Sequence, residues 1–276
     1  MENIRFLIKN YAVSRLGIGN ILKCLISSLS VNDDTVIECY PEYIYGNYDT
    51  VLDQRFISKN DCFNKEIEIV YTCRLLIHKS EEHIQNDLPS EELYMGGLTN
   101  PRFHSLFSFT KRIDWNYESS RIHITIQRRI FNTIAKIKFT PTVYNEVERN
   151  MTFFKGNHVL GMSVRTWLSS HETNVNREYN FEMYKSVMDI LRGSITHIIF
   201  SIDNIEYIRL YIEYFNKYDI SYTVLLKHDG INDIQFAVTK MLTLSRCQYI
   251  IGNRISTFTE LIYWFGRCIP VIYPIG

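Results

Sequence analysis

The second half of the chain alternates between two hydrophobic patterns. Short apolar runs, typical of strands buried on both faces of a parallel sheet, alternate with longer segments in which apolar residues recur at helical spacing. The pattern predicts strands at residues 159–164, 197–201, 221–226, 249–251 and 270–273. It predicts helices at residues 178–192, 205–217, 234–244 and 257–265. Five strands joined by four helices indicate an α/β fold with a parallel sheet.

The first half of the chain is less regular. Strands are predicted at residues 4–8, 35–40 and 66–76, and a helix at residues 21–29. Residues 121–138 fit a helical period, while the alternation at 122–126 also fits a strand, so both interpretations stay open. Glycines and prolines interrupt residues 87–116, which predicts a long loop region. Residues 139–150 are interpreted as a junction, which divides the chain into domains at 1–145 and 146–276.

Composition excludes some classes of function. The 276 residues are 46% hydrophobic and 22% charged, which is ordinary for a protein with a sizeable core. Lys plus Arg and Asp plus Glu both number 30, so a general nucleic-acid binder is not expected. A small anionic ligand held by one or two arginines is still compatible with this balance. No apolar run reaches the length of about 20 residues that spans a bilayer, so we expect a soluble, cytoplasmic protein.

The six cysteines are scattered, with neither a C-x-x-C pair nor Cys and His at zinc-ligand spacing. Free and mostly buried thiols are therefore expected, and no resident metal or cofactor. The sequence also lacks a G-x-x-x-x-G-K-[ST] loop and a G-x-S-x-G elbow, which disfavours P-loop and serine-hydrolase chemistry. A D-x-D triplet, the usual means by which a glycosyltransferase presents a divalent ion, is absent as well.

Candidate chemistry lies where predicted strands end, because ligands of open α/β sheets bind at the carboxyl edge. Arg165 follows the strand at 159–164 and has the geometry to bind two phosphate oxygens, although pairing with a surface carboxylate would explain it equally well. Asp203 follows the next strand, where capping of the following helix is the simpler role. The turn at 201–204 is also placed to face a nucleobase.

The third candidate spot is the turn at residues 252–260. Gly252 permits a tight turn, and Ser256 or Thr257 is expected to cap the next helix, with Thr257 and Glu260 at the spacing of a capping box. Capping alone explains these residues. A helix N-terminus nevertheless suits a phosphate. Interpretation of this turn as a binding site is favoured because Arg165 would come from the end of a neighbouring strand.

These segments resemble the fucosyltransferase-like superfamily of GT-B glycosyltransferases, which includes nodulation, α-1,6- and protein O-fucosyltransferases. Residues 159–166 look like the family's "IGVHIRRTD" strand, with Arg165 at its phosphate-binding arginine, and residues 197–203 look like its "FIFSDD" strand. Residues 244–261 look like "LSRCDYLIGSRSSTFSELA", the longest match. Gly17, Ile18, Gly19 and Asn20, with Lys23, are similar to the family's "GLGNQL" turn.

The resemblance implies a GT-B-like fold, in which two Rossmann-like domains face a cleft, with the acceptor on the first and the nucleotide-sugar on the second. It implies an inverting, metal-independent transfer from a nucleotide-diphosphate sugar, GDP-fucose above all, to a hydroxyl of an oligosaccharide or glycoprotein. The implied donor-binding residues are Gly17, Gly19, Asn20, Ser163, Ser201, Asp203, Asp233 (with Asp229 next), Asn253, Ser256, Thr257 and Phe258. The general base is not identified; the candidates are Asp53, Asp87, Glu91, Glu92 and Asp114.

Two positions depart from the family pattern. Ser163 replaces the family's histidine and Thr166 its second arginine, so a UDP-sugar such as UDP-xylose competes with GDP-fucose as the expected donor. A non-catalytic nucleotide- or glycan-binding protein on the same fold is the alternative of a different class, and a nucleoside-processing α/β enzyme is a third. The small size and the Ile-, Asn- and Tyr-rich composition are similar to those of stand-alone glycosyltransferases of large DNA viruses.

Overall fold

The structure is a computed structural model. It describes residues 5–7, 19, 22, 26, 36–38, 124–154, 158–166, 179–253 and 256–275, and all structural statements below concern these residues. The chain divides into two compact units, and residues 144–232 and 236–276 make up most of the second. The cleft between two domains that the resemblance implies stays a prediction.

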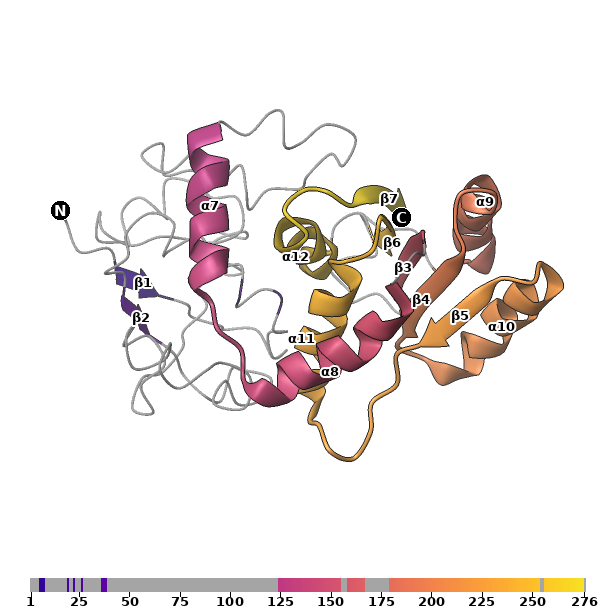
Figure 1. Ribbon diagram of the computed structural model, residues 1–276, viewed down its shortest axis with the longest axis horizontal. Helices are drawn as coiled ribbons and strands as arrows, with labels where there is room; N and C mark the ends of the chain where they lie inside the picture. Colours follow the sequence, from indigo (N-terminus) through magenta and orange to yellow (C-terminus); the bar gives the residue numbers. More distant parts are fainter. Residues whose placement is uncertain are drawn as a thin grey trace, which may run out of the picture. The chain divides into compact units, whose positions relative to one another are not determined.

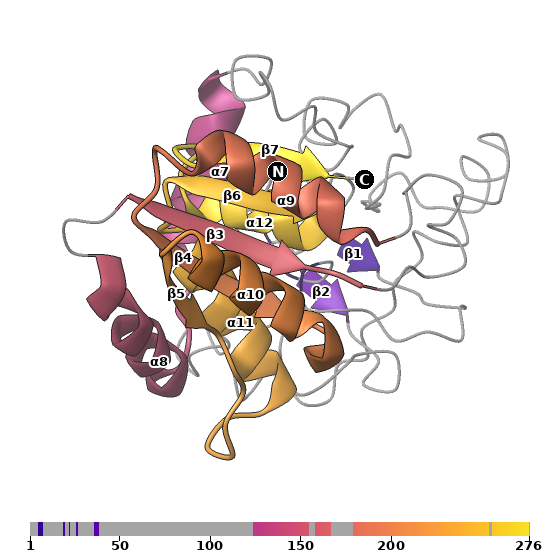
Figure 2. The ribbon, with the colours of Figure 1, turned by 90° about the vertical axis from the view of Figure 1, so that its right-hand side faces the viewer.

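The second unit is built on a parallel sheet of five strands, as its hydrophobic pattern predicts. The strands are β3 (Val159–Val164), β4 (His197–Ile202), β5 (Ser221–Val224), β6 (Tyr249–Asn253) and β7 (Val271–Ile275). Their order is β5-β4-β3-β6-β7, so β3 lies in the middle. Figure 2 shows β4 and β5 on one side of β3, and β6 and β7 on the other. The strand order therefore reverses between β3 and β6, the position at which ligands bind in such sheets.

Helices cover both faces of this sheet. Helices α9 (Phe181–Leu191) and α10 (Ile208–Lys217) lie on one face, and α11 (Asp233–Leu244) and α12 (Thr257–Phe265) on the other (Figures 1 and 2). The central strands are consequently buried on both sides, and every residue of β4 except Ile202 is buried. This two-sided burial explains why the strands read as continuous apolar runs in the sequence.

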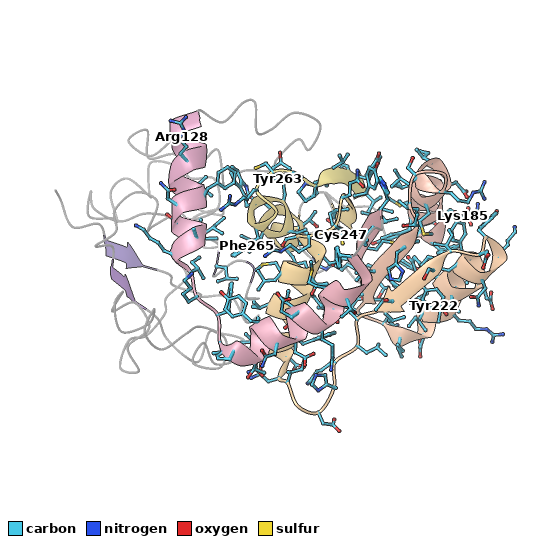
Figure 3. The ribbon with its side chains drawn as sticks, viewed as in Figure 1. Arg128, Lys185, Tyr222, Cys247, Tyr263 and Phe265 are labelled. Atoms are coloured by element: carbon cyan, nitrogen blue, oxygen red, sulfur yellow. The ribbon has the colours of Figure 1, made fainter. Side chains whose placement is uncertain are left out.

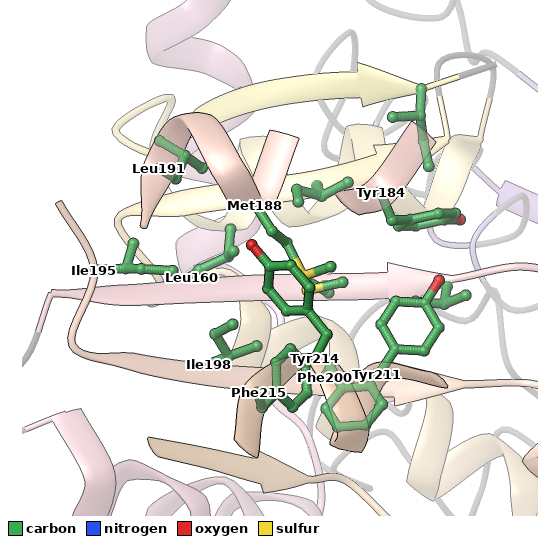
Figure 4. Packing of buried hydrophobic residues seen from close by; sticks show 14 residues of the cluster. Leu160, Tyr184, Met188, Leu191, Ile195, Ile198, Phe200, Tyr211, Tyr214 and Phe215 are labelled. Carbon is green, nitrogen blue, oxygen red and sulfur yellow. The ribbon is translucent and has the colours of Figure 1, made fainter. Parts of the chain in front are cut away.

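An aromatic cluster fills the space between the sheet and the first pair of helices. Phe200 of β4 packs against Tyr211 and Phe215 of α10, and Tyr184 and Met188 of α9 close the cluster (Figure 4). The rings of Phe200 and Phe215 meet edge to face, with centroids 5.3 Å apart. Such pairs contribute about 0.5–1.5 kcal/mol beyond the area that they bury. The cluster fixes α9 and α10, and with them the ends of β3 and β4.

On the opposite face, two glycines allow close packing. A Cβ atom added to Gly161 of β3 would lie 2.7 Å from Ile250 Cδ1 and 2.9 Å from Cys247 Sγ. One added to Gly252 of β6 would lie 2.5 Å from Thr259 Oγ1, so α12 sits directly against the backbone of β6. Cys247, labelled in Figure 3, is buried, and burial raises the pKa of its thiol. It is a packing residue, as expected of the free cysteines.

The observed elements differ from the predicted ones at several ends. The helix predicted at 205–217 begins as a 3-10 turn, Ile205–Tyr207, before α10. The strand predicted at 221–226 stops at Val224, and Leu226 is 58% exposed. Helix α9 starts at Phe181 because the Asn180 side chain caps it by accepting from the N–H of Glu182. The two helix starts follow local capping groups, Asn180 and Asn204, which the hydrophobic period does not report.

The segment before the sheet is helical, and a boundary between the two compact units falls within it, after Val143. Residues 139–150, predicted to be a junction, include helix α8 (Pro141–Met151), followed by a 3-10 turn at Thr152–Phe154. Pro141 begins the helix, where its missing N–H leaves no hydrogen bond unmade. Asn150 Nδ2 donates to Thr243 Oγ1 of α11 over 3.3 Å. The ambiguous stretch at 121–138 contains helix α7 (Ile124–Lys136).

In the remaining part of the chain, β1 (Arg5–Leu7) pairs in parallel with β2 (Val36–Glu38), within two of the predicted strands. Leu22 and Ile26, from the predicted helix at 21–29, are helical and buried. The predicted strand at 66–76 and loop at 87–116 lie outside the described residues. Within the described part of the chain, none of the helices is both long and apolar enough to cross a membrane.

Candidate functional site

Three strand ends meet at the centre of the sheet's carboxyl edge. Because β3 pairs with β4 on one side and with β6 on the other, the residues that follow these strands are neighbours in space. The register aligns Val164 with Ile202 on one side and Met162 with Ile251 on the other. The structure thus places Arg165, Asp203 and Asn253 at the ends of neighbouring strands, although these residues lie far apart in the sequence.

Arg165 directly follows β3, as predicted, and Val164 points inward with 3% exposure. The backbone N–H of Arg165 donates to the hydroxyl oxygen of Tyr184, at 3.3 Å. Tyr184 stands in the first turns of α9 and is buried, which raises the pKa of its phenol. A neutral hydroxyl fixed in the core therefore holds the backbone of the candidate phosphate-binding arginine.

Asp203 does not cap the helix after β4, contrary to the simpler expectation. Asn204 is the cap, and its side-chain oxygen accepts from the N–H of Glu206 at 3.0 Å. The Asp203 carboxylate turns instead to β3, where it accepts from the N–H of Thr166 at 3.0 and 3.1 Å and from the Thr166 hydroxyl at 2.7 Å. The ends of β3 and β4 are therefore joined beyond the last residues of the sheet.

The N-terminus of α12 follows β6 at the same edge. Ser256 is the cap: its backbone is extended, and its hydroxyl oxygen accepts from the N–H groups of Phe258 and Thr259 at 3.2 and 3.5 Å. Thr257 is the first helical residue, so the capping box predicted for Thr257 and Glu260 does not form. The hydroxyl of Ser256 acts as an acceptor in both bonds, so its own hydrogen can be donated to an anion.

Other expected donor residues have varied positions. Ser163 and Ser201 are paired within the sheet and not beyond its edge, and Ser201 is buried. Asn253 ends β6 and is also buried. Phe258 is half-buried, with Lys240 Nζ 6.0 Å from its ring centroid. Asp233 is exposed as the first residue of α11.

The remaining donor-binding candidates are mostly outside the described residues. Gly19 is buried and helical, whereas Gly17 and Asn20 lie outside the described residues, as does the side chain of Thr257. The same holds for every candidate base: Asp53, Asp87, Glu91, Glu92 and Asp114. Among the residues described, no group of three or more His, Cys, Asp or Glu could hold a metal ion. Metal independence stays a prediction.

Sequence reasoning missed a set of tyrosines beside the strand ends. Tyr184 occupies an apolar position of α9, so helical periodicity assigns it to the core and does not reveal its hydroxyl's bond to Arg165. The hydroxyls of Tyr179 and Tyr211 lie 3.3 Å apart, and the Tyr179 ring meets that of Tyr207 edge to face at 4.8 Å. The concentration of Tyr in 179–222 was the signal that could have indicated them.

The electrostatics of this edge favour a small anion. The positive end of the α12 dipole and the cationic residue Arg165 both belong to this edge, since α12 follows β6 and Arg165 follows the neighbouring strand β3. Asp203 is the opposing charge, and its carboxylate is occupied by Thr166. The arrangement can therefore bind a phosphate or diphosphate by charge-assisted hydrogen bonds.

The overall fold is shared with solved fucosyltransferases. The fucosyltransferase NodZ from Bradyrhizobium is 16% identical over 100% of this chain and 96% of that chain, with a TM-score of 0.53. NodZ α-1,6-fucosyltransferase soaked with GDP-fucose is 15% identical over 96% and 93% of the two chains, with a TM-score of 0.51. POFUT1 in complex with GDP-fucose is 11% identical over 99% and 98%, with a TM-score of 0.50.

No protein-family model matches the sequence, and none of the curated proteins matches it. The likeness to known proteins is thus one of fold. It is a mixed α/β fold with a parallel sheet, of the kind that fucosyltransferases have.

Proposed function

We propose that this protein is a glycosyltransferase that moves a sugar from a nucleotide-diphosphate donor to a hydroxyl of a glycan. The observation that carries the proposal is that Arg165 and the capped N-terminus of α12 follow neighbouring strands, β3 and β6, at the point where the strand order reverses. Solved fucosyltransferases with the same fold support it, because two of them hold or were soaked with GDP-fucose.

In the proposed reaction, the acceptor hydroxyl attacks the anomeric carbon as the bond from that carbon to the diphosphate oxygen breaks. Attack from the face opposite the leaving group inverts the configuration. Negative charge grows on the departing diphosphate, and Arg165, Ser256 and the N–H groups at the start of α12 stabilise it without a metal ion. A carboxylate from among Asp53, Asp87, Glu91, Glu92 and Asp114 takes the acceptor proton.

GDP-fucose is the proposed donor, and a UDP-sugar such as UDP-xylose is the alternative. The absence of a histidine at Ser163 and of a second arginine at Thr166 reduces the positive charge around the diphosphate, which favours testing both nucleotides. An oligosaccharide or glycoprotein is the proposed acceptor. A cytoplasmic location and a viral source stay predictions.

Thermal unfolding in the presence of GDP, UDP, GDP-fucose and UDP-xylose tests the proposal. A ligand at a hundred times its Kd adds about 2.7 kcal/mol to the free energy of unfolding, which raises the melting temperature by several degrees. Each titration is run with EDTA and with Mg²⁺, and equal shifts are expected. The absence of a shift with all four compounds would contradict the proposal.

A turnover assay separates an enzyme from a binding protein on the same fold. The enzyme is expected to hydrolyse its donor slowly without an acceptor, with release of the nucleoside diphosphate. Tight binding without release, over a panel of glycan acceptors, would instead identify a non-catalytic nucleotide-binding protein.

A further inference from the structure

The backbone on both sides of the Arg165–Thr166 peptide bond is held by side chains from outside β3. The N–H of Arg165 donates to Tyr184 of α9, and the N–H of Thr166 donates to the carboxylate of Asp203, which follows β4. Asp203 also donates its own N–H to the carbonyl oxygen of Val164, at 3.4 Å. The last buried residue of β3, Val164, and the two residues after it are therefore held by groups from α9 and from the end of β4.

The contact between Thr166 and Asp203 is a compact one. The carboxylate accepts the N–H of Thr166 with both oxygens, and the Thr166 hydroxyl donates to Oδ1 at 2.7 Å, the length of a strong bond to a charged acceptor. A carboxylate offers about four acceptor sites, so three of them are directed to a single residue. Little of Asp203 is left to contact a ligand.

The negative charge of Asp203 also argues against direct contact with a diphosphate. A carboxylate placed against a diphosphate repels it, whereas one that accepts three hydrogen bonds from Thr166 is held back on the β4 side of the edge. Thr166 has no charge of its own, so Arg165 is the cationic residue at the end of β3.

We propose that Asp203 is a positioning residue: through Thr166 it sets the backbone direction at the end of β3, and so aims Arg165 at the diphosphate. This role differs from the direct donor contact that the sequence suggested for Asp203, and it rests on the proposed function. Tyr184 of α9 contributes the second support, at the N–H of Arg165. A small change in the backbone direction at Arg165 should affect binding, because bidentate binding by arginine depends on the orientation of the whole guanidinium group.

The Thr166→Val and Thr166→Ser variants test the inference without altering charge. Valine has the shape of threonine but lacks the hydroxyl, whereas serine keeps it. The measurement is the Kd for GDP, or for UDP if the wild type prefers it, by titration calorimetry, with the melting temperature of each ligand-free variant. We expect Thr166→Val to bind on the order of tenfold more weakly and Thr166→Ser to bind nearly as the wild type does.

Asp203→Ala and the Thr166→Val/Asp203→Ala double variant test whether the pair acts as one unit. The double variant is expected to bind no more weakly than Asp203→Ala alone, because both changes remove the same contact. Glu206→Gln is the matched control, since it removes one negative charge from the exposed turn after β4 and should leave the Kd unchanged. If Asp203→Ala does not fold, the two Thr166 variants still decide the question.

The inference is overturned if Thr166→Val binds the nucleotide as tightly as the wild type while Asp203→Asn binds it weakly, since Asp203 would then contact the donor itself. It is also overturned if both Thr166 variants bind like the wild type. A wild type that binds neither nucleotide contradicts the proposed function, a result distinct from both of these. With a turnover assay in hand, Thr166→Val should lower kcat at saturating donor, an effect that a loss of stability alone would not produce.

Discussion

Arg165 is the residue on which the proposed chemistry depends most. Its place after a buried strand could be read from the sequence, because alternation sends Val164 inward and ends the strand there. What could not be read is how the end of the strand is held, since Tyr184 bonds to the backbone of Arg165, and Asp203 to Thr166, from elements that are distant in the chain. Long-range side-chain contacts of this kind leave no local pattern.

Replacing Arg165 tests its role directly. Arg165→Ala is expected to lower kcat/KM for the donor by at least about a hundredfold, the typical cost of removing one group that stabilises a leaving oxyanion. The kcat/KM of Arg165→Lys should fall between those of the wild type and Arg165→Ala, because lysine keeps the charge but not the planar fork of the guanidinium. Arg209→Ala is the control, an arginine of α10 that is 85% exposed. Full activity in Arg165→Ala would remove this residue from the mechanism.

His197 shows how a buried residue ties stability to pH. Its Nδ1 lies 3.0 Å from Ser221 Oγ and its Nε2 2.9 Å from Thr223 Oγ1, and burial lowers the pKa of the ring. The unfolded chain therefore takes up a proton more readily than the folded one. The stability contributed by the neutral ring is complete above the unfolded pKa of about 6.5 and is lost as pH falls below it, by up to about 1.4 kcal/mol per pH unit.

Urea unfolding between pH 5 and 8 measures this effect. The His197→Gln variant should be less stable at pH 8 and should lose less stability than the wild type on acidification. The exposed His158 gives the matched control, since His158→Gln is expected to leave the pH profile unchanged. Parallel profiles for the wild type and His197→Gln would show that another group is responsible.

At the scale of elements, most of the second unit could be predicted because its strands are buried on both faces and its helices recur between them. The exception is α8, a helix that was not predicted within the junction at 139–150. Pro141 stands at the first helical position, where it starts a helix and does not interrupt one. Similarly, the sequence left open whether Ser256 or Thr257 caps α12, because the two choices differ by one residue in where the helix starts.

The cap of α12 allows stability and binding to be separated. Ser256→Ala should lower the free energy of unfolding by about 1 kcal/mol, since the N–H groups of Phe258 and Thr259 lose their acceptor. Ser256→Asp should keep the stability of the helix, because aspartate is a good cap and suits the dipole. Its charge should nevertheless greatly weaken GDP binding. Unchanged GDP affinity in Ser256→Asp would show that the serine is only a cap.

The approach of α12 to the sheet depends on Gly252. Gly252→Ala is expected to destabilise the protein by about 1–3 kcal/mol, because the new methyl group would overlap Thr259, whose Oγ1 lies 2.5 Å from the ideal Cβ position. Adding Thr259→Ala should recover part of the loss. Gly193→Ala is the control, since nothing lies within 4 Å of its added Cβ. Denaturant unfolding of the three variants measures the difference.

At the scale of the whole molecule, the fold of NodZ and POFUT1 is retained at 11–16% identity, so the arrangement of strands persists while almost every residue differs. The chain has no net formal charge, with 30 basic and 30 acidic residues. For the proposed function, we therefore expect the attraction of a nucleotide-diphosphate to come from the local arrangement at the end of β3 and the start of α12, not from a field of the entire surface.

The reversal of strand order between β3 and β6 also has a consequence for folding. Strands β3, β4 and β5 follow one another along the chain and sit side by side, so they can assemble as soon as they are synthesised. Strand β6 pairs with β3 but comes much later in the chain. Until the two strands pair, that edge of β3 can pair with other strands. We therefore expect Arg165 to take its place at the end of β3 before the N-terminus of α12 is positioned next to that strand. If the proposed function holds, a nucleotide that contacts both would bind only the complete sheet, and we expect it to stabilise only chains that have finished folding.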